Sequence, residues 1–593
     1  MQGSVKRFLD YFSITTESSC APRRFGLSAV VLALLLVAGL VTARGQGLSV
    51  LDLQPWLVKS SAMVKSEPGG SVKLINLNPN IDSWYILEYR TASGVTRSYH
   101  LENAFPGIYK LELDELAGRV LVKDSTGDRC VLWQAGRDSL FNLSQNTKRP
   151  FVELCNGTVY LRNQTEGRRT KKEWAVDLLR DRVKYGENIT NFIKEKFFRD
   201  KYRQTGISQN QKAAGADPSH RGRPVRLKTI ARADSIALNA PELNFTIERD
   251  PGGGMRPGRW YPVPGYAGVF VSSVRPELVQ QESSWVQRGL LSPLEDKELS
   301  ALVYLVAFDL SMFDLGFALG TDHPRVGWSD RIPESSRDSE LPGPDGFDNV
   351  FPLVRTGKIN PREVTKVAAT FAGGFKRSHG AFKWGDLANQ NHGTHYGFMV
   401  NGVVISILQP GLATLLVHDD GRVDMQTWKK EDSVLLPHIR YARQNGVPLL
   451  EPDTGSWSLL PGRFVKDWAK GNWSGSESKE LRTLRAGTCI QETDSTSFLI
   501  YAYFSAAIPS TMARVLNSCN CSYAMHLDMN APEHTYLAIY RVEEDQFVVQ
   551  RLVKEMAEVD PPVDGVELPR YIGYSDNRDF FYLLRKDKAE VTE

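Results

Sequence analysis

The stretch YGFMVNGVVISILQPGLATLLVHDDGRVDMQTW, residues 396–428, decides the fold class of the larger part of this chain. Its β-branched and apolar runs are separated by Asn401-Gly402 and Asp420-Gly421, two dipeptides that favour type I′ turns. Such a turn joins two antiparallel strands through two residues, so the stretch predicts consecutive β-hairpins. We interpret these hairpins as a scaffold for the polar residues of the neighbouring blocks.

A second strand-like region precedes this scaffold. WYILEYR (residues 84–90) is followed by a Ser93-Gly94 turn and then by VTRSYHL, with further alternating runs up to about residue 133. Residues 174–202 are amphipathic and predict one or two helices. The polar sequence QNQKAAGADPSHRGRPVR then contains Gly and Pro and is typical of a linker.

These regions predict an α+β fold with two domains, as a chain of 593 residues leads us to expect. A small β-rich N-terminal domain with a helical end would occupy residues 44–204, and a linker would occupy residues 205–233. The larger C-terminal domain would span residues 234–580 and contain a β-rich mixed sheet. A charged tail would follow at residues 581–593.

The overall charge excludes several classes of partner. Lys and Arg number 72 and Asp and Glu number 69, so the formal net charge is +3. A chain so nearly neutral lacks the basic character that nucleic-acid binding requires, and any anionic ligand has to be held by local residues. The six cysteines form no pair of CxxC motifs, so we expect no structural zinc site. We also expect no cofactor and no metal ligands among the site residues.

One stretch near the N-terminus has a different composition. FGLSAVVLALLLVAGLVTA, residues 25–43, contains no charged residue and approaches the ~20 residues that a membrane-spanning helix needs. Four basic residues precede it, at positions 6, 7, 23 and 24, which favours a cytoplasmic N-terminus. The stretch predicts a single-pass transmembrane signal anchor, with residues 1–24 cytoplasmic and the main body periplasmic or extracellular. A cleaved signal peptide is the alternative, and it exports the body as well.

Export would place five of the six cysteines in an oxidising compartment, where disulfides persist. Cys130 and Cys155 lie in one region of the chain, and Cys489, Cys519 and Cys521 lie in another. We therefore expect one bridge in each region, with one thiol left over.

Four blocks of the predicted larger domain combine glycines with polar side chains. The first two are GFALGTDHPRVGW (316–328) and TFAGGFKRSHGAFKW (370–384). The second block has two consecutive glycines after an apolar run, which allow the backbone to approach a ligand closely, and then a cation and a titratable donor. The candidate ligand-binding residues of these two blocks are His323, Gly373, Gly374, Lys376 and His379.

The other two blocks are LRAGTCI (484–490) and AMHLDMNAPEHTYLAIY (524–540). Arg485 begins a short run able to form a strand, and arginine suits forked hydrogen bonding to a phosphate or carboxylate. Asp528 and Asn530 are two residues apart, so they share a face at the end of a predicted strand. This pair suits recognition of sugar hydroxyls and nucleophilic or base chemistry, but an Asx turn that closes the strand explains it equally well.

Taken in order, the blocks resemble the phosphodiester glycosidase family, which contains the lysosomal uncovering enzyme and bacterial exopolysaccharide-associated proteins. The resemblance covers about half of the chain, residues 258–540, from PGRWYPV and SSVRPEL through RQNGVPLLEPDTGSW to AMHLDMN. The family's pattern has an asparagine before the double glycine and LDGGGS near its end. Here Ala372 replaces that asparagine, and Leu527-Asp528-Met529-Asn530 replaces the glycine-rich run.

The resemblance implies hydrolysis of a sugar-1-phosphodiester in a glycan or exopolysaccharide, which releases the sugar and leaves a phosphomonoester. This chemistry needs a carboxylate at the anomeric carbon, a cation on the phosphodiester and a donor to the departing oxygen. The expected catalytic residues in these roles are Asp528, Arg485 and His379. The expected substrate-binding residues are Asn530, Lys376, Gly373, Gly374 and His323.

Two other functions compete with this one. Ala372 favours a non-catalytic envelope protein that binds phosphate-containing glycans, because a polar residue is missing beside the double glycine. A metal-dependent phosphodiesterase that uses Asp322, His323 and His379 is the third possibility, although these residues form no usual cluster of metal ligands.

Overall fold

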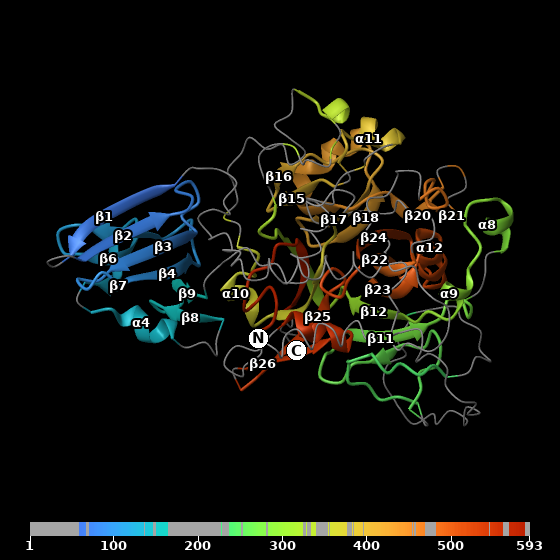
Figure 1. Cartoon of the computed structure of the whole chain (residues 1–593), viewed down its shortest axis with the longest axis horizontal. Coiled ribbons are helices and arrows are strands. Elements are labelled where there is room, and N and C mark those ends of the chain that lie inside the picture. Colours follow the sequence, from blue (N-terminus) through green and yellow to red (C-terminus); the bar gives the residue numbers. More distant parts are fainter. Residues whose placement is uncertain are drawn as a thin grey trace, which may run out of the picture. The chain divides into compact units, whose positions relative to one another are not determined.

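The computed structural model describes residues 59–163 and 227–587, apart from gaps, of which the longer ones are 228–236, 324–327, 340–353, 376–381, 469–481 and 561–567. The described residues belong to one compact unit, formed by residues 49–168 and 201–593. They form five sheets, in which every strand pair is antiparallel. The longest described α-helix, α12 (Pro509–Ser518), has ten residues (Figure 1).

The structure corrects the predicted fold class. The sheets are antiparallel rather than mixed, and the short described helices make the architecture β-rich rather than α+β. Across the part of the chain that the structure describes, no helix has the length and apolar character needed to cross a membrane. The predicted anchor at residues 25–43, the cytoplasmic tail, the helices at 174–202 and most of the linker lie outside the described residues. Because no described helix could cross a membrane, the prediction of a single-pass membrane protein is corrected.

Residues 60–162 form two of the sheets. In order across the six-stranded sheet lie β1 (Ser60–Ser66), β2 (Gly70–Asn76), β3 (Trp84–Arg90), β4 (Thr96–Asn103), β9 (Val159–Arg162) and β8 (Phe151–Leu154). The three-stranded sheet contains β5 (Lys110–Asp114), β6 (Arg119–Asp124) and β7 (Gly127–Gln134), and α4 (Ser139–Ser144) follows it. Leu87, Val122 and Trp133 belong to the apolar core of this region.

The strands after residue 260 form three sheets. An eight-stranded sheet has the order β10 (Tyr261–Pro262), β11 (Val269–Val274), β12 (Val303–Asp309), β23 (Ser497–Ala507), β22 (Thr483–Glu492), β24 (Tyr523–Met529), β20 (Pro448–Pro452) and β21 (Leu459–Pro461). One five-stranded sheet has the order β13 (Phe313–Ala318), β27 (Phe580–Arg585), β14 (Val367–Ala372), β25 (Leu537–Glu543) and β26 (Gln546–Arg551). The other has the order β16 (Val403–Ser406), β15 (Phe398–Val400), β19 (Ile439–Gln444), β17 (Ala413–His418) and β18 (Val423–Thr427).

Short helices connect these strands. They are α8 (Ser283–Gln287), α9 (Asp296–Leu299), η1 (Glu334–Ser336), α10 (Pro361–Val364), α11 (Asp386–Gln390), η3 (Lys430–His438) and η4 (Lys554–Val559). Strand β27 begins at the predicted end of the larger domain, residue 580, and continues into the segment predicted to be a charged tail.

The predicted hairpins of residues 396–428 are confirmed. β15 pairs with β16 around Asn401-Gly402, and β17 pairs with β18 around Asp420-Gly421. Asn401 and Gly402 both have positive φ, at 49° and 79°, as a type I′ turn requires.

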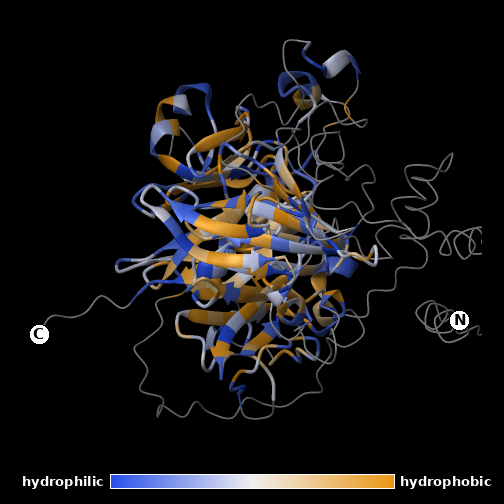
Figure 2. Cartoon of the chain, turned by 90° about the vertical axis from the view of Figure 1, so that its left-hand side faces the viewer, coloured by the Kyte–Doolittle hydropathy of each residue, from blue (hydrophilic) through white to orange (hydrophobic). Residues whose placement is uncertain are grey.

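The eight-stranded sheet is buried on both faces. Along β23, side chains alternate between two apolar cores: Leu499, Tyr501 and Tyr503 belong to one, and Ile500, Ala502 and Phe504 belong to the other. β22, β23 and β24 are therefore almost continuously buried instead of alternating with solvent. Figure 2 shows hydrophobic residues along the middle of many strands and hydrophilic ones at their ends. Polar side chains inside such strands need partners from the protein itself.

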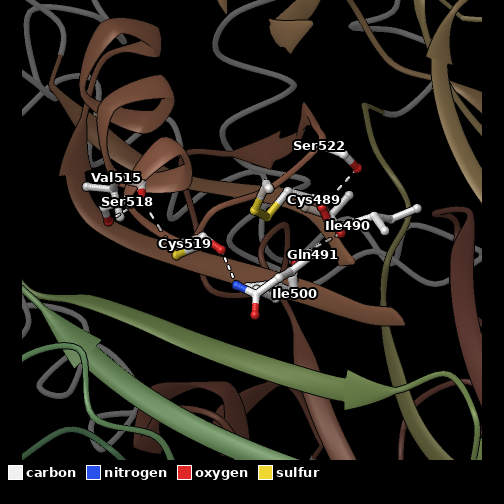
Figure 3. Close-up of a disulfide and its surroundings, with 10 residues drawn as sticks. Cys489, Ile490, Gln491, Ile500, Val515, Ser518, Cys519 and Ser522 are labelled. Atoms are coloured by element: carbon white, nitrogen blue, oxygen red, sulfur yellow. Dashed lines mark hydrogen bonds between the residues drawn. A yellow bond between two sulfur atoms is a disulfide. The ribbon is translucent and has the colours of Figure 1, made fainter. Parts of the chain in front are cut away.

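The disulfides follow the prediction of one bridge in each region. Cys130 is bonded to Cys155 and Cys489 to Cys521, and Cys519, which is buried and outside both bridges, donates from Sγ to the carbonyl of Val515 at 3.5 Å. Figure 3 shows the second bridge between β22 and the segment that precedes β24, with Cys519 at the end of α12. This bridge holds the start of β24, the strand that carries Asp528, against its neighbour β22.

Candidate active site

Two of the predicted residues lie at the end of β24. Asp528 is buried, and its Oδ2 accepts a hydrogen bond from Arg578 Nε at 3.2 Å. Its Oδ1 accepts one from the backbone N–H of Met529 at 2.8 Å. Asn530 has a positive φ of 82°, and its Oδ1 accepts from Thr483 Oγ1 at 3.2 Å. The Asn530 side chain thus closes the strand against the start of β22.

A polar segment just before β27, residues 576–579, links Asp528 to a second carboxylate. Arg578 Nη1 donates to Asn577 Oδ1 at 3.4 Å, and Asn577 Nδ2 donates to Asp322 Oδ2 at 3.4 Å. All four side chains in this chain of hydrogen bonds, from Asp528 to Asp322, are buried. Two carboxylates from distant parts of the sequence therefore share one hydrogen-bonded network.

The same segment holds His323 through Asp579. Asp579 Oδ2 lies 2.9 Å from His323 Nδ1 and accepts a hydrogen bond from Arg443 Nε at 3.1 Å, and Oδ1 accepts from the Gly320 N–H at 3.0 Å. Burial raises the pKa of Asp579, but His323 and Arg443 outweigh that effect, so its pKa is lowered overall. Asp579 is therefore an ionised carboxylate, and His323 Nδ1 carries the proton of their hydrogen bond.

Two aromatic rings of β15 and its preceding residues pack against this cluster. The His323 ring lies 5.1 Å from the ring of Tyr396 and 5.4 Å from that of Phe398. The Arg443 guanidinium lies 5.2 and 5.8 Å from the same two rings. Arg443 Nη2 also donates to the carbonyl of Phe375 at 3.1 Å. The histidine and the arginine are thus fixed by shared packing and by a shared carboxylate.

The double glycine packs against protein groups of this site. The Gly373 N–H donates to the carbonyl of Asp579 at 2.8 Å. Gly374 has a φ of 152°, and a Cβ there would lie 2.5 Å from Asn445 Oδ1. Asn445 in turn donates to the carbonyls of His526, at 2.9 Å, and Leu527, at 2.7 Å. The close approach that the glycines permit brings β14 against the residues that flank Asp528.

Arg485 has a different set of partners. It is fully buried on β22, where Nε donates to the carbonyl of Ala507 at 2.8 Å and Nη1 lies 3.3 Å from His526 Nε2. Its guanidinium lies 5.5 Å from the ring of Trp468, and burial lowers the pKa of Arg485 to about 9. These partners tie Arg485 to the neighbouring strand and to an indole.

The structure brings some of the predicted site residues together. Asp528, His323 and Gly373 each hydrogen-bond to residues 576–579, and Gly374 packs against Asn445, which donates to the two carbonyls that precede Asp528. Lys376 and His379 lie outside the described residues. The sequence predictions missed Arg443, Asn577, Arg578 and Asp579. The signal of Asn577, Arg578 and Asp579 is the run SDNRD at residues 575–579, which places five polar residues directly before the apolar strand FFYLL.

The functional groups of the site are carboxylates, an imidazole and guanidinium groups. Among the described residues, no group of three or more His, Cys, Asp or Glu side chains is placed to hold a metal ion. Paired carboxylates with an oriented imidazole suit acid–base hydrolysis at a carbon or an acyl centre.

Comparison with known proteins gives distant structural similarities. No protein-family model and no curated protein sequence matches the chain. The catalytic domain of zebrafish N-acetylglucosamine-1-phosphodiester alpha-N-acetylglucosaminidase, auto-inhibited by its pro-peptide, is 10% identical over 55% of this chain and 85% of that domain, with a TM-score of 0.27.

Two bacterial structures are similarly remote. One is a protein from Burkholderia pseudomallei that is described as a putative exported protein. It is 12% identical over 50% of this chain and 76% of its own, with a TM-score of 0.20. A hypothetical protein from Synechocystis is 9% identical over 85% of this chain and 97% of its own, with a TM-score of 0.23. The chain thus resembles a phosphodiester glycosidase domain distantly, and similarities of this size assign it no activity.

Proposed function

We propose that the chain is a hydrolase that cleaves a sugar-1-phosphodiester, releasing the sugar and leaving a phosphomonoester. The observation that carries the proposal is the buried network from Asp528 through Arg578 and Asn577 to Asp322. Glycoside hydrolysis is commonly performed by two carboxylates whose environments differ, and this network provides two. The ordered sequence blocks that resemble phosphodiester glycosidases supply the substrate class.

In this mechanism Asp528 stabilises the positive charge that develops at the anomeric carbon. Its ion pair with Arg578 favours the ionised carboxylate, which suits that role. Phosphate is a good leaving group, so the departing oxygen needs little protonation. Arg578 is the arginine that pairs with Asp528, and Arg485 stays a prediction for the cation that holds the phosphodiester. Lys376 and His379 stay predictions for binding the phosphate and donating to the departing oxygen.

A non-catalytic protein that binds phosphate-containing glycans is the second candidate. Ala372, at the end of β14, is buried, and its backbone N–H donates to the carbonyl of Tyr536 at 3.0 Å. An alanine there supplies no side-chain hydrogen bond to a ligand beside the double glycine. Turnover separates the two candidates, because a binding protein holds the sugar phosphodiester without releasing products.

The test is a released-product assay on the purified chain with sugar-1-phosphodiesters. We expect Asp528→Asn to lower kcat by about 10³-fold or more, because the anomeric charge loses its counter-charge. Asp420→Asn is the matched control, since Asp420 lies in an exposed turn where an asparagine Oδ1 can still accept from the backbone N–H of Arg422. Binding without turnover by the wild type would favour the second candidate. Unchanged kcat in Asp528→Asn would contradict the assigned site.

A further inference from the structure

His323 is fully buried, yet one of its nitrogens is left unused. Nδ1 is bonded to Asp579, whereas Nε2 has no hydrogen-bond partner among the described residues. Buried polar atoms are nearly always paired, so an unpaired one calls for an explanation. A nitrogen with a free lone pair, held inside a network of carboxylates, is suited to accept a proton from a reacting group.

The hydrogen bond to Asp579 determines which nitrogen of His323 donates. Asp579 is an ionised carboxylate that also pairs with Arg443 at 3.1 Å, so it accepts and His323 Nδ1 donates. The other nitrogen, Nε2, is therefore the one left to accept a proton.

The packing prevents the ring from exchanging its two nitrogens. His323 and Arg443 lie against the same pair of rings, Tyr396 and Phe398. Asp579 is itself held by the Gly320 N–H. Nδ1 therefore stays on the carboxylate and Nε2 keeps one direction.

The chain connects this imidazole to Asp528. Asp579, which holds His323, directly follows Arg578, which holds Asp528. Asp322, which directly precedes His323, ends the hydrogen-bonded network that starts at Asp528. Two links that both start at Arg578 thus join the imidazole and the carboxylate into one site.

We propose that His323 is the general base that takes a proton from the attacking water, and that Asp579 and Arg443 are positioning residues that orient it. The proposal rests on the proposed hydrolysis of a sugar-1-phosphodiester. An O–H bond of the water breaks and its proton goes to Nε2, while the water oxygen forms a bond to the anomeric carbon. The bond from that carbon to the phosphate oxygen breaks, and its electron pair leaves with the phosphomonoester. Nε2 then returns its proton to solvent.

The first test replaces His323 by asparagine. The asparagine amide can donate to Asp579 where Nδ1 does, but it has no atom in the place of Nε2. We expect His323→Asn to lower kcat by about 10²- to 10⁴-fold and to abolish the fall of activity on the acidic side of the pH profile. Wild-type kcat in this variant would overturn the inference and leave the proposed function standing. Absence of turnover in the wild type would overturn both.

The second test addresses the positioning residues. Arg443→Met removes a cation that opposes protonation of the imidazole, so the acidic limb of the kcat profile should move to higher pH. Arg443→Lys keeps the charge and should leave that limb in place. A purely structural role of Arg443 would change the folded fraction without moving the limb in either variant, and that result would overturn the assignment. If Arg443→Met does not fold, Arg443→Lys decides alone. Loss of the acidic limb in Arg443→Lys, as expected for His323→Asn, would overturn the assignment too.

Discussion

Asp560 and Asp579 are both fully buried carboxylates beside an arginine, but their surroundings differ in kind. Asp560 accepts hydrogen bonds from the Tyr536 hydroxyl at 2.6 Å, from Arg551 Nε at 2.9 Å and from the Arg570 N–H at 3.1 Å. The Tyr574 hydroxyl donates to it as well. Asp579 instead accepts from an imidazole, a guanidinium and a backbone N–H.

The identity of the donors separates a structural cluster from a reactive one. Burial raises the pKa of Tyr536 well above its usual value, so this hydroxyl keeps its proton at any physiological pH. The donors of Asp560 therefore act only as hydrogen-bond partners. The imidazole bound to Asp579 has a second nitrogen that can take up a proton. Burial and pairing alone do not distinguish the two carboxylates, and the chemistry of the neighbours does.

The largest expected effect comes from exchanging each carboxylate for its amide. Asp579→Asn should lower kcat by about 10³- to 10⁴-fold, because the amide no longer fixes the tautomer of His323. Each variant leaves a buried arginine, Arg443 or Arg551, without its counter-ion, so both should lower the free energy of unfolding by about 3–5 kcal/mol. Only Asp579→Asn, and not Asp560→Asn, should lower kcat per folded molecule, and kcat together with urea unfolding of both variants tests this difference. Equal losses of kcat in the two variants would remove the distinction.

A smaller effect should separate the two glycines that border the Asp579 cluster. Gly374→Ala should lower the free energy of unfolding by about 2–3 kcal/mol, because its φ is positive and the new Cβ would lie 2.5 Å from Asn445 Oδ1. Gly373→Ala should cost about 1 kcal/mol or less, since its Cβ would approach the Asp579 carbonyl only to 3.2 Å. Urea unfolding of the two variants measures the difference. A larger loss in Gly373→Ala would contradict this account of the packing.

A third carboxylate, Glu102, whose side chain is 13% exposed, extends the comparison. It lies 3.5 Å from Arg162 Nε, and its Oε2 has no hydrogen-bond partner among the described residues. Burial raises the pKa of Glu102 to about 7, whereas the donors around Asp579 lower the pKa of that group. Between the ordinary pKa of glutamate and pH 7, the folded chain therefore binds more protons than the unfolded chain.

This difference predicts a pH dependence of stability. The contribution of Glu102 to the free energy of unfolding should fall as the pH rises from about 4.5 to about 7, by roughly 2 kcal/mol. Glu102→Gln should lose this dependence, so the stability of the variant relative to the wild type should rise over the same window. Thermal unfolding of both chains at pH 5 and pH 8 measures the change. A constant difference at the two pH values would rule it out.

Local patterns predicted several features correctly. The Asn-Gly and Asp-Gly dipeptides identify the hairpins, since a tight turn depends on adjacent residues, but only Asn401-Gly402 has the two positive φ angles of a type I′ turn. The grouping of cysteines along the chain predicts the two bridges. The mixed sheet was wrong because strands buried on both faces lose their alternation, and continuous apolar runs are typical of parallel strands too.

The site was predicted only in part because its contacts join distant residues. His323 and Asp579 are 256 positions apart, and no local pattern predicts that pairing. Arg485 has the residue type expected of a phosphate ligand, but residue type cannot distinguish a guanidinium that binds substrate from one that ties strands together. The position of Asp528 at the end of a strand was visible in the sequence, whereas its partner Arg578 depends on how β27 enters the sheet.

Strand β27 has a consequence for how the protein is made. It lies between β13 and β14, although both precede it by about 200 residues or more in the chain. A nascent chain in which residues 576–585 have not yet been synthesised lacks Arg578 and Asp579. It also lacks the strand that pairs with both β13 and β14. Insertion of this strand closes the sheet and delivers both side chains in one event. The proposed site would therefore be complete only when translation has passed β27.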